Sequence, residues 1–189
     1  RGLVVTGEHA HRMTDRAVAA LKASNDRKLF LKLAGGLTLG DAGAAMIMGP
    51  KLGPDSGFMG FMLQSQGQFS HLCTCGNYRG QDTALETDMS EIVLHGIRLL
   101  GDMYKELMAK LNWQPEQIRK FVHHQVGLKV FKHHARYAGI STKIMPNTIT
   151  SLGNLVSANI PVAFYNMMKN KEVSAGDKIF VAGAGSGLA

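Results

Sequence analysis

Cysteine is scarce in this sequence, which has two cysteines, five prolines and one tryptophan in 189 residues. Two cysteines are too few for a disulfide framework, so we expect a reducing compartment, the cytoplasm. No apolar run approaches the roughly 20 residues that a membrane-spanning helix requires. A basic and then apolar leader is also missing. The chain starts at Arg1 inside a predicted strand, and we expect it to be a piece of a longer protein.

The two cysteines lie close together, as Cys73 and Cys75. On a strand this spacing puts both side chains on one face, in a geometry too strained for an ordinary disulfide. Half of a zinc site would need a second pair of cysteines or histidines at suitable spacing, and none follows. We therefore predict two structural thiols.

Acidic residues are outnumbered by basic ones, and the formal net charge is +7 with a pI near 9.5. Such a charge favours an anionic partner: nucleic acid, a phosphate-bearing molecule or an acidic protein. The basic stretches have little aromatic interleaving and match no nucleic-acid-binding motif, so we do not expect nucleic acid.

Strand and helix patterns alternate along the chain, which predicts a layered α/β fold. The clearest helix is 87–111, where apolar residues recur at three- and four-residue spacing. The other predicted helices are 14–24, 126–138 closed by Gly139, and one that holds Pro161 in its first turn and ends near Lys171. The predicted strands are 1–8, 40–49, 58–67, 69–75, 118–124 and 178–185.

Two prolines and two glycines in PKLGPDSG predict a linker over 51–57. It would separate a first unit, 1–50, from a second, 58–189. GDAGAAMIMG at 40 and GDKIFVAGAG at 176 share Gly-Asp followed by small and apolar residues. This similarity hints at a fold that is built twice.

Adjacent histidines close the strand of FVHHQVG at 121–127. Successive side chains on a strand point to opposite faces, so His123 and His124 cannot share a site. One of them can act at the strand end, while the other packs or meets solvent.

The remaining paired histidines are weaker candidates. His9 and His11 could share a face and hold a metal, but no third ligand follows at convincing spacing, so we expect surface residues and no metal site. His133 and His134 point about 100° apart on a helix, and we expect them at the surface as well.

A second chemistry-bearing stretch is SLGNLVSANIP at 151–161. Gly153 can adopt a backbone conformation closed to other residues, which would aim Asn154 into a cavity. Carboxamide and imidazole N–H groups placed together can stabilise an oxygen that gains negative charge. The glycine loop 183–187, GAGSG, could add backbone N–H groups, although such a loop alone is a weak indication.

These stretches, in this order, resemble β-ketoacyl-acyl-carrier-protein synthase III of the thiolase superfamily. The similar segments are VHHQVGLKVFKHHARYAGI, LGNLVSANIP, AGDKIFVAGAGSGL, GDAGAAM and LVVTGE. The resemblance implies a layered α-β-α-β-α fold made of two halves. Residues 1–50 would be the end of the first half, and 58–189 nearly all of the second.

The resemblance also implies an acyltransferase that joins two acyl thioesters in a Claisen condensation. His124 and Asn154 would be catalytic and would stabilise the enolate oxygen, and the backbone N–H of Ser186 would form the oxyanion hole. The nucleophilic cysteine of the family lies before the LVVTGE strand, upstream of this chain. Neither Cys73 nor Cys75 is assigned as the nucleophile.

Three basic residues, Lys129, Lys132 and Arg136, lie along one predicted helix face. By resemblance they would bind the phosphates of coenzyme A or an acidic acyl-carrier protein; a solvated helix face explains them equally well. No cofactor beyond the acyl thioester substrate is implied. A homodimer formed together with the first half is expected from the family.

One departure from the family pattern bears on the substrate. The segment His124-Gln125-Val126-Gly127 looks more like the long-chain, head-to-head condensing relatives of olefin biosynthesis than the enzyme that initiates fatty-acid synthesis. Two alternatives stay open: an acyltransferase or thioester hydrolase without condensation, and a non-catalytic module that binds acyl carriers.

Overall fold

A computed structural model describes the chain except for residues 76, 79–80, 83 and 186–189. Its helices are α1 (His11–Lys22), α2 (Arg27–Leu33), α3 (Met89–Lys110), α4 (Leu128–Ala138), α5 (Ile149–Leu152) and α6 (Asn159–Lys169). Its strands are β1 (Gly2–Glu8), β2 (Ala42–Met48), β3 (Cys73–Thr74), β4 (Asn77–Tyr78), β5 (Gln81–Asp82), β6 (Glu86–Thr87), β7 (Ile118–His123) and β8 (Lys178–Ala182). Short 3₁₀ turns are η1 (Ala34–Thr38), η2 (Gly67–Leu72), η3 (Pro115–Gln117), η4 (Thr142–Ile144) and η5 (Val156–Ala158).

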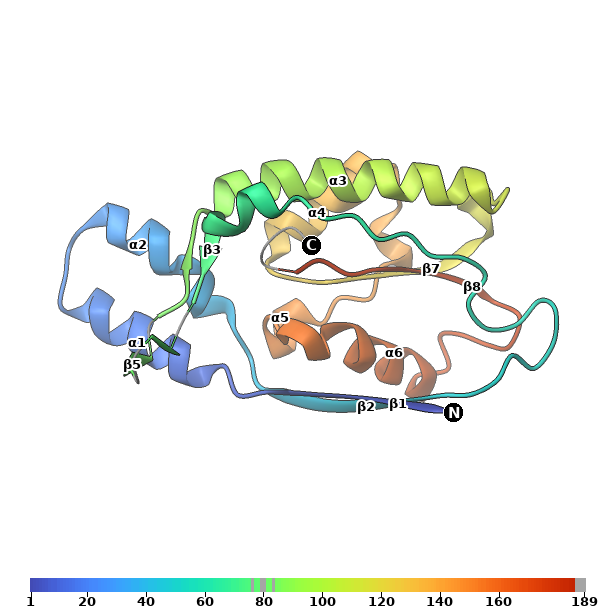
Figure 1. The fold of residues 1–189 in the computed structure, drawn as a ribbon, viewed down its shortest axis with the longest axis horizontal. Coiled ribbons are helices and arrows are strands. Elements are labelled where there is room, and N and C mark those ends of the chain that lie inside the picture. The colour runs from blue at the N-terminus through green and yellow to red at the C-terminus, as the bar shows by residue number, and fades with distance from the viewer. Residues whose placement is uncertain (76, 79–80, 83, 186–189) are drawn as a thin grey trace.

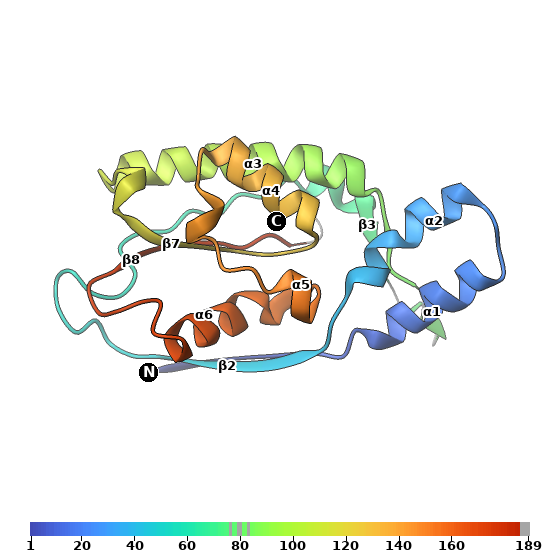
Figure 2. The same cartoon turned by 180° about the vertical axis from the view of Figure 1, so that it is seen from behind.

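The elements stack in four layers, in the order α3 with α4, β7 with β8, α5 with α6, and β1 with β2 (Figures 1 and 2). β7 and β8 pair in parallel, and β1 and β2 pair antiparallel over their whole lengths. This stacking agrees with four layers of the predicted α-β-α-β-α order, and the α/β class is confirmed. Helices α1 and α2 extend beyond the layers as an arm (Figure 1).

The core above the β7–β8 sheet is aromatic. Phe121 of β7 lies opposite Phe180 of β8 in the register, and their rings stack at 5.2 Å. Tyr104 of α3 meets both rings edge-on, at 5.7 and 4.9 Å. Phe131 of α4 belongs to the same cluster. Rings of this size bury a large apolar area, so this cluster fixes α3 and α4 on the upper face.

The lower face of the same sheet packs on α6. Val122 of β7 and Ala163 and Met167 of α6 are fully buried together, with Ile179 of β8 beside them. Neighbouring residues Phe121 and Val122 therefore serve opposite layers, as the two-residue period of a strand requires.

The segment between β2 and α3 differs from its prediction. No strand lies between 58 and 67, and 69–75 forms η2 followed by the two-residue β3. The apolar residues of 58–63 alternate poorly, and Phe58, Phe61 and Leu63 are largely exposed. A strand is stable only beside a partner, and this stretch has none within the described chain.

Among the described residues, no helix covers the outer face of β1 and β2 (Figures 1 and 2). Leu3, Val5 and Ile47 share that face and are 66%, 67% and 80% exposed. An apolar sheet face of this kind is typical of a surface that another structural layer covers.

Candidate active site

His124 lies directly after β7, where its backbone N–H donates to the carbonyl of Ala182 at 2.9 Å. Its ring faces the α6 side, close to Asn159. The ring of His123 lies on the other side of the strand, 5.3 Å from those of Phe131 and His134. The two adjacent histidines therefore occupy opposite faces, as predicted from strand alternation.

Asn154 reaches the same region from the loop between α5 and η5. Its backbone N–H donates to the carbonyl of Thr38 at 2.7 Å, and its own carbonyl accepts from the N–H of Gly40 at 2.9 Å. Leu39 and Asn154 thereby form an isolated parallel bridge. The segment that leads into β2 thus holds the Asn154 loop from below.

Gly153 adopts φ 75° and ψ −169°, a region populated almost only by glycine. A Cβ atom at this position would meet the Thr38 carbonyl oxygen at 2.8 Å. The prediction that Gly153 uses glycine-specific backbone freedom is confirmed. Because glycine has no Cβ atom, the loop can approach the Thr38 carbonyl this closely.

We expect Gly153→Ala to lower the free energy of unfolding by about 2–3 kcal/mol, because it combines backbone strain with a clash against a fixed carbonyl. Gly127→Ala is the matched control: Gly127 has an extended φ of 173° and open space where the Cβ would lie. Urea unfolding of both variants measures the difference. Equal stability of the two variants would contradict the strain argument.

Asn159, the first residue of α6, connects the two predicted catalytic residues. Its Nδ2 donates to the Asn154 Oδ1 atom at 3.2 Å and to the Gln125 carbonyl at 2.9 Å. The same nitrogen lies 3.4 Å from Nδ1 of His124. Asn159 is 1% exposed. His124 and Asn154, 30 residues apart in the sequence, thus touch one buried amide group.

The orientation of the Asn154 carboxamide follows from its backbone partner. The N–H of Val156 donates to Oδ1 of Asn154 at 3.0 Å, and a backbone N–H can only donate. Oδ1 therefore accepts from both Val156 and Asn159. The Nδ2 group is left as a donor without an acceptor in the described part of the chain.

Val156 itself has φ 49°, which is an unfavourable left-handed conformation for a β-branched residue. Strain of this kind persists only where surrounding contacts fix the backbone. Here the contact is the hydrogen bond to Asn154, so the strained turn holds the carboxamide in place.

Gln125 fixes the loop that follows His124. Its Oε1 accepts from the N–H groups of Thr148 at 3.0 Å and Ile149 at 3.1 Å, and its Nε2 donates to the Pro146 carbonyl at 2.8 Å. The side chain is 1% exposed. Both polar atoms of its amide are thus hydrogen-bonded to backbone groups. These bonds connect the chain just after β7 to the segment that leads into α5.

Burial lowers the pKa of His124 from its ordinary value, and a backbone hydrogen bond with Val156 opposes part of this shift. A neutral imidazole therefore prevails at pH 7. It carries one ring N–H, which can donate to an oxygen, and its second nitrogen is an acceptor.

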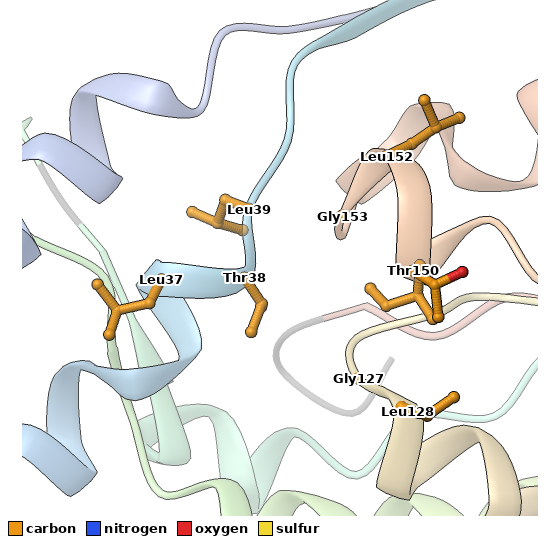
Figure 3. Close-up of a pocket in the computed structure, with 9 residues that line it drawn as sticks. Leu37, Thr38, Leu39, Gly127, Leu128, Thr150, Leu152 and Gly153 are labelled. Atoms are coloured by element: carbon orange, nitrogen blue, oxygen red, sulfur yellow. The ribbon is translucent and has the colours of Figure 1, made fainter.

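A cavity of about 410 Å³ opens beside this network (Figure 3). One wall is Leu37, Thr38 and Leu39, and the facing wall is the end of α5 with the start of α4 (Figure 3). Gly153 contributes to the lining next to Asn154, and Gly127 contributes two residues after Gln125. Four of the nine lining residues are leucines and a fifth is Ile149, and such side chains suit an aliphatic chain.

The other predicted site residues lie elsewhere. Ser186 falls outside the described residues. Lys129, Lys132 and Arg136 are exposed on α4 and form no ion pair within the described residues; α4 begins at the cavity-lining Leu128. His133 is exposed as predicted. His134 is a correction, because it turns toward His123 and its Nδ1 is buried.

Residues 108–189 match the family described as the C terminal of 3-oxoacyl-[acyl-carrier-protein] synthase III. The chain is 27% identical to an acyl-CoA:acyl-CoA alkyltransferase of Xanthomonas campestris, over 98% of this chain and 54% of that protein. It is also 27% identical to β-ketoacyl-[acyl-carrier-protein] synthase III of Staphylococcus aureus, over 79% of this chain and 46% of that protein.

A crystal structure of X. campestris OleA with bound lauric acid and lauroyl-CoA superposes with a TM-score of 0.85 at 27% identity, covering 98% of this chain and 55% of that one. The chain is thus similar to synthase III-like condensing enzymes of the thiolase superfamily, and its residues 108–189 carry the match to the family. This synthase III-like chain spans about half the length of the relatives it matches. None of the helices in the described part of the chain has both the length and the apolar composition of a membrane-spanning segment.

Within this synthase III-like site, Asn159 is the residue that sequence reasoning missed. It lies in the predicted motif LGNLVSANIP, five residues after Asn154 and two before Pro161. A polar side chain at the start of an apolar helix is one indication that was available. Its role as the shared contact of His124 and Asn154 depends on tertiary structure.

Proposed function

We propose that the protein carrying this chain is a condensing acyltransferase, which forms a carbon–carbon bond between two acyl thioesters. The observation that carries the proposal is the Asn159 amide, which contacts both His124 and Asn154 in a buried position beside the cavity. The names of the relatives, a β-ketoacyl synthase and an acyl-CoA:acyl-CoA alkyltransferase, support the same class of reaction.

The chemistry required is stabilisation of an enolate. When a thioester loses its α-proton or a carboxyl group, negative charge develops on its carbonyl oxygen. A neutral His124 and the unpaired Nδ2 of Asn154 are two N–H donors that could meet that oxygen. Each such donor typically contributes about 10²–10³-fold in rate. The enolate carbon then attacks the carbonyl carbon of the acyl group held on the enzyme, and the C–S bond to the enzyme breaks with release of the thiolate. The family resemblance implies that this thiolate belongs to a cysteine upstream of this chain.

The surroundings suit an acyl thioester. A leucine-lined cavity of about 410 Å³ can accept an aliphatic chain, and it falls in the size range of ligand pockets. Lys129, Lys132 and Arg136 are exposed on the helix that starts at its rim. We propose that they meet the phosphates of coenzyme A or the acidic surface of a carrier protein. A homodimer and a cytoplasmic location stay predictions.

Product analysis tests this function. The full-length protein is incubated with an isotopically labelled long-chain acyl-CoA, alone and with a malonyl thioester, and the products are identified by mass spectrometry. We expect a β-keto product that contains two acyl units. A labelled free acid alone would identify a thioester hydrolase, and failure to release any acyl group from a range of thioesters would favour a non-catalytic binding module.

A further inference from the structure

A second set of reactive side chains lies where the arm of α1 and α2 joins the β1–β2 sheet. His9 and His11 follow β1, and Asp41 directly precedes β2. One donor atom from each of the three lies within 4.8 Å of the others. All three residues are exposed. The sequence could not reveal this group, because Asp41 is 30 residues from His11 and lies just before the partner strand β2.

Backbone contacts hold the carboxylate of this group in place. Oδ1 of Asp41 accepts from the N–H of Ala10 at 2.6 Å and from that of His11 at 3.0 Å. Oδ2 faces Nδ1 of His11 at 2.6 Å. The hydrogen bond with the His11 side chain, followed by those from the two backbone N–H groups, lowers the pKa of Asp41, so the carboxylate is ionised at neutral pH.

His9 takes no part in the ion pair between His11 and Asp41, so that pair does not account for the position of the His9 ring. Its ring lies edge-on to that of His11, with centroids 4.2 Å apart, and it makes no hydrogen bond to any described residue. Two imidazoles and one carboxylate therefore meet at a solvent-exposed point, and the imidazole of His9 has no hydrogen bond to any described residue.

We propose that His9, His11 and Asp41 bind a divalent first-row transition metal ion, for which Zn²⁺ is the test case. Imidazole nitrogen and carboxylate oxygen are both zinc ligands, and three protein ligands leave a fourth position for water. Imidazole disfavours Mg²⁺ and Ca²⁺, which take oxygen ligands. Bonds of about 2.0–2.1 Å to a tetrahedral Zn²⁺ ion put neighbouring ligand atoms roughly 3.3 Å apart. The His11 and Asp41 atoms, now 2.6 Å apart, would have to separate, and the wider pairs would have to close. Exposed side chains can make both changes by rotation.

Such an ion would join three segments: the end of β1, the start of α1 and the start of β2. It would tie the arm to the sheet at the point where the chain enters and leaves the arm (Figure 1). Because the folded state alone brings the ligands together, binding stabilises that state. At a free ion concentration about 100 times Kd, the Tm of the full-length protein should rise by a few degrees. This inference is independent of the proposed condensation.

The test uses the full-length protein with C73S and C75S substitutions, which remove the thiols of this chain as competing ligands. Zn²⁺ binding is measured by isothermal titration calorimetry and by thermal unfolding, and Co²⁺ is added as a spectroscopic probe of the ligands. We expect saturable binding of Zn²⁺ that excess Mg²⁺ does not displace, together with visible Co²⁺ absorption bands.

Variants assign the site. H9A removes a ligand that has no other hydrogen bond, and it should weaken Zn²⁺ binding at least about tenfold and reduce the Tm shift. H11A and D41N should do the same, and D41N retains an oxygen for the backbone N–H groups. H71A, at another exposed histidine, is the matched control and should bind as the parent does. Unchanged Zn²⁺ affinity in H9A, or equal losses in H9A and H71A, would overturn the proposal.

Discussion

Asn154→Ala should lower the rate of condensation by about 10²–10³-fold while the first acyl transfer continues. The carboxamide of Asn154 has its oxygen occupied by Val156 and Asn159, so only its Nδ2 group can act on a substrate. Alanine removes that donor. Acylation of the nucleophile does not build charge on the oxygen of the second thioester, so it does not require the donor.

The isosteric variant Asn154→Asp sharpens the test. It keeps the oxygen that accepts from Val156 but replaces the donor with a second acceptor. A carboxylate there would repel the enolate oxygen, so this variant should condense no faster than the alanine variant. Asn170→Ala changes an exposed asparagine beyond α6 and is the matched control, with the parent rate expected.

Two measurements separate the steps. Mass spectrometry of the intact protein after a single addition of acyl-CoA follows acylation, and the appearance of β-keto product follows condensation. His124→Ala should fail at the same step, and the double variant should lose much less than the product of the two single losses, because both donors serve one oxygen. If either single variant condenses at the rate of the parent, the proposed catalytic role of that residue is wrong.

The helices and strands of the layers could be predicted because apolar residues recur along the sequence at the spacing of the helix or the strand. Apolar residues three and four apart predicted a helix over 87–111, and α3 covers Met89–Lys110. The strands at 1–8, 40–49 and 118–124 were also correct within two residues at each end. In each case one face is buried against a neighbouring layer, so local pattern and tertiary environment agree.

Other segments depend on tertiary contacts that local patterns do not report. Helix α2 was not predicted, although Asp26 caps it by accepting from the N–H of Lys28 at 2.8 Å. The stretch 58–67 is apolar enough for a strand but finds no edge to pair with among the described residues. The same limit applies to Asp41, whose nearness to His11 depends on the pairing of β1 with β2.

In the candidate site, the sequence identified His124 and Asn154 through their motifs, and the structure brings them to one amide. It could not identify what orients them. Asn159 and Gln125 act by pairing with backbone atoms of other segments, and such pairs leave no local pattern. The prediction for His134 failed for a similar reason: its environment is set by His123 of another element.

Two neighbouring histidines, the buried His123 and the half-buried His134, should make the protein sensitive to acid. Burial is the main cause that lowers the pKa of His123 from 6.5 to about 3 and that of His134 to about 4, and the neighbouring histidines add to both shifts. Neither ring nitrogen of His123 has a hydrogen-bond partner in the described structure. A proton on the His123 ring would place an unpaired charge in the core, and a proton on the His134 ring would place a charge directly beside it.

The sign of the effect follows from proton binding. Above pH 6.5 both histidines are neutral in the folded and unfolded states, so they cause no pH dependence there. Below pH 6.5 the unfolded state takes up protons that the folded state does not, so stability falls as the pH is lowered toward the folded pKa values. Each histidine contributes a slope of about 1.4 kcal/mol per pH unit in this window.

Urea unfolding between pH 8 and pH 4.5 measures this slope. Fluorescence of Trp113, the single tryptophan of the chain, reports on the core cluster it packs against. His123→Phe should remove the slope due to His123 and should also raise stability at pH 8, because two unpaired buried nitrogens disappear. His71→Phe, at an exposed position, should leave the slope unchanged. If the unfolding free energy of His123→Phe falls with pH as steeply as that of the parent, protonation of His123 does not limit stability in acid.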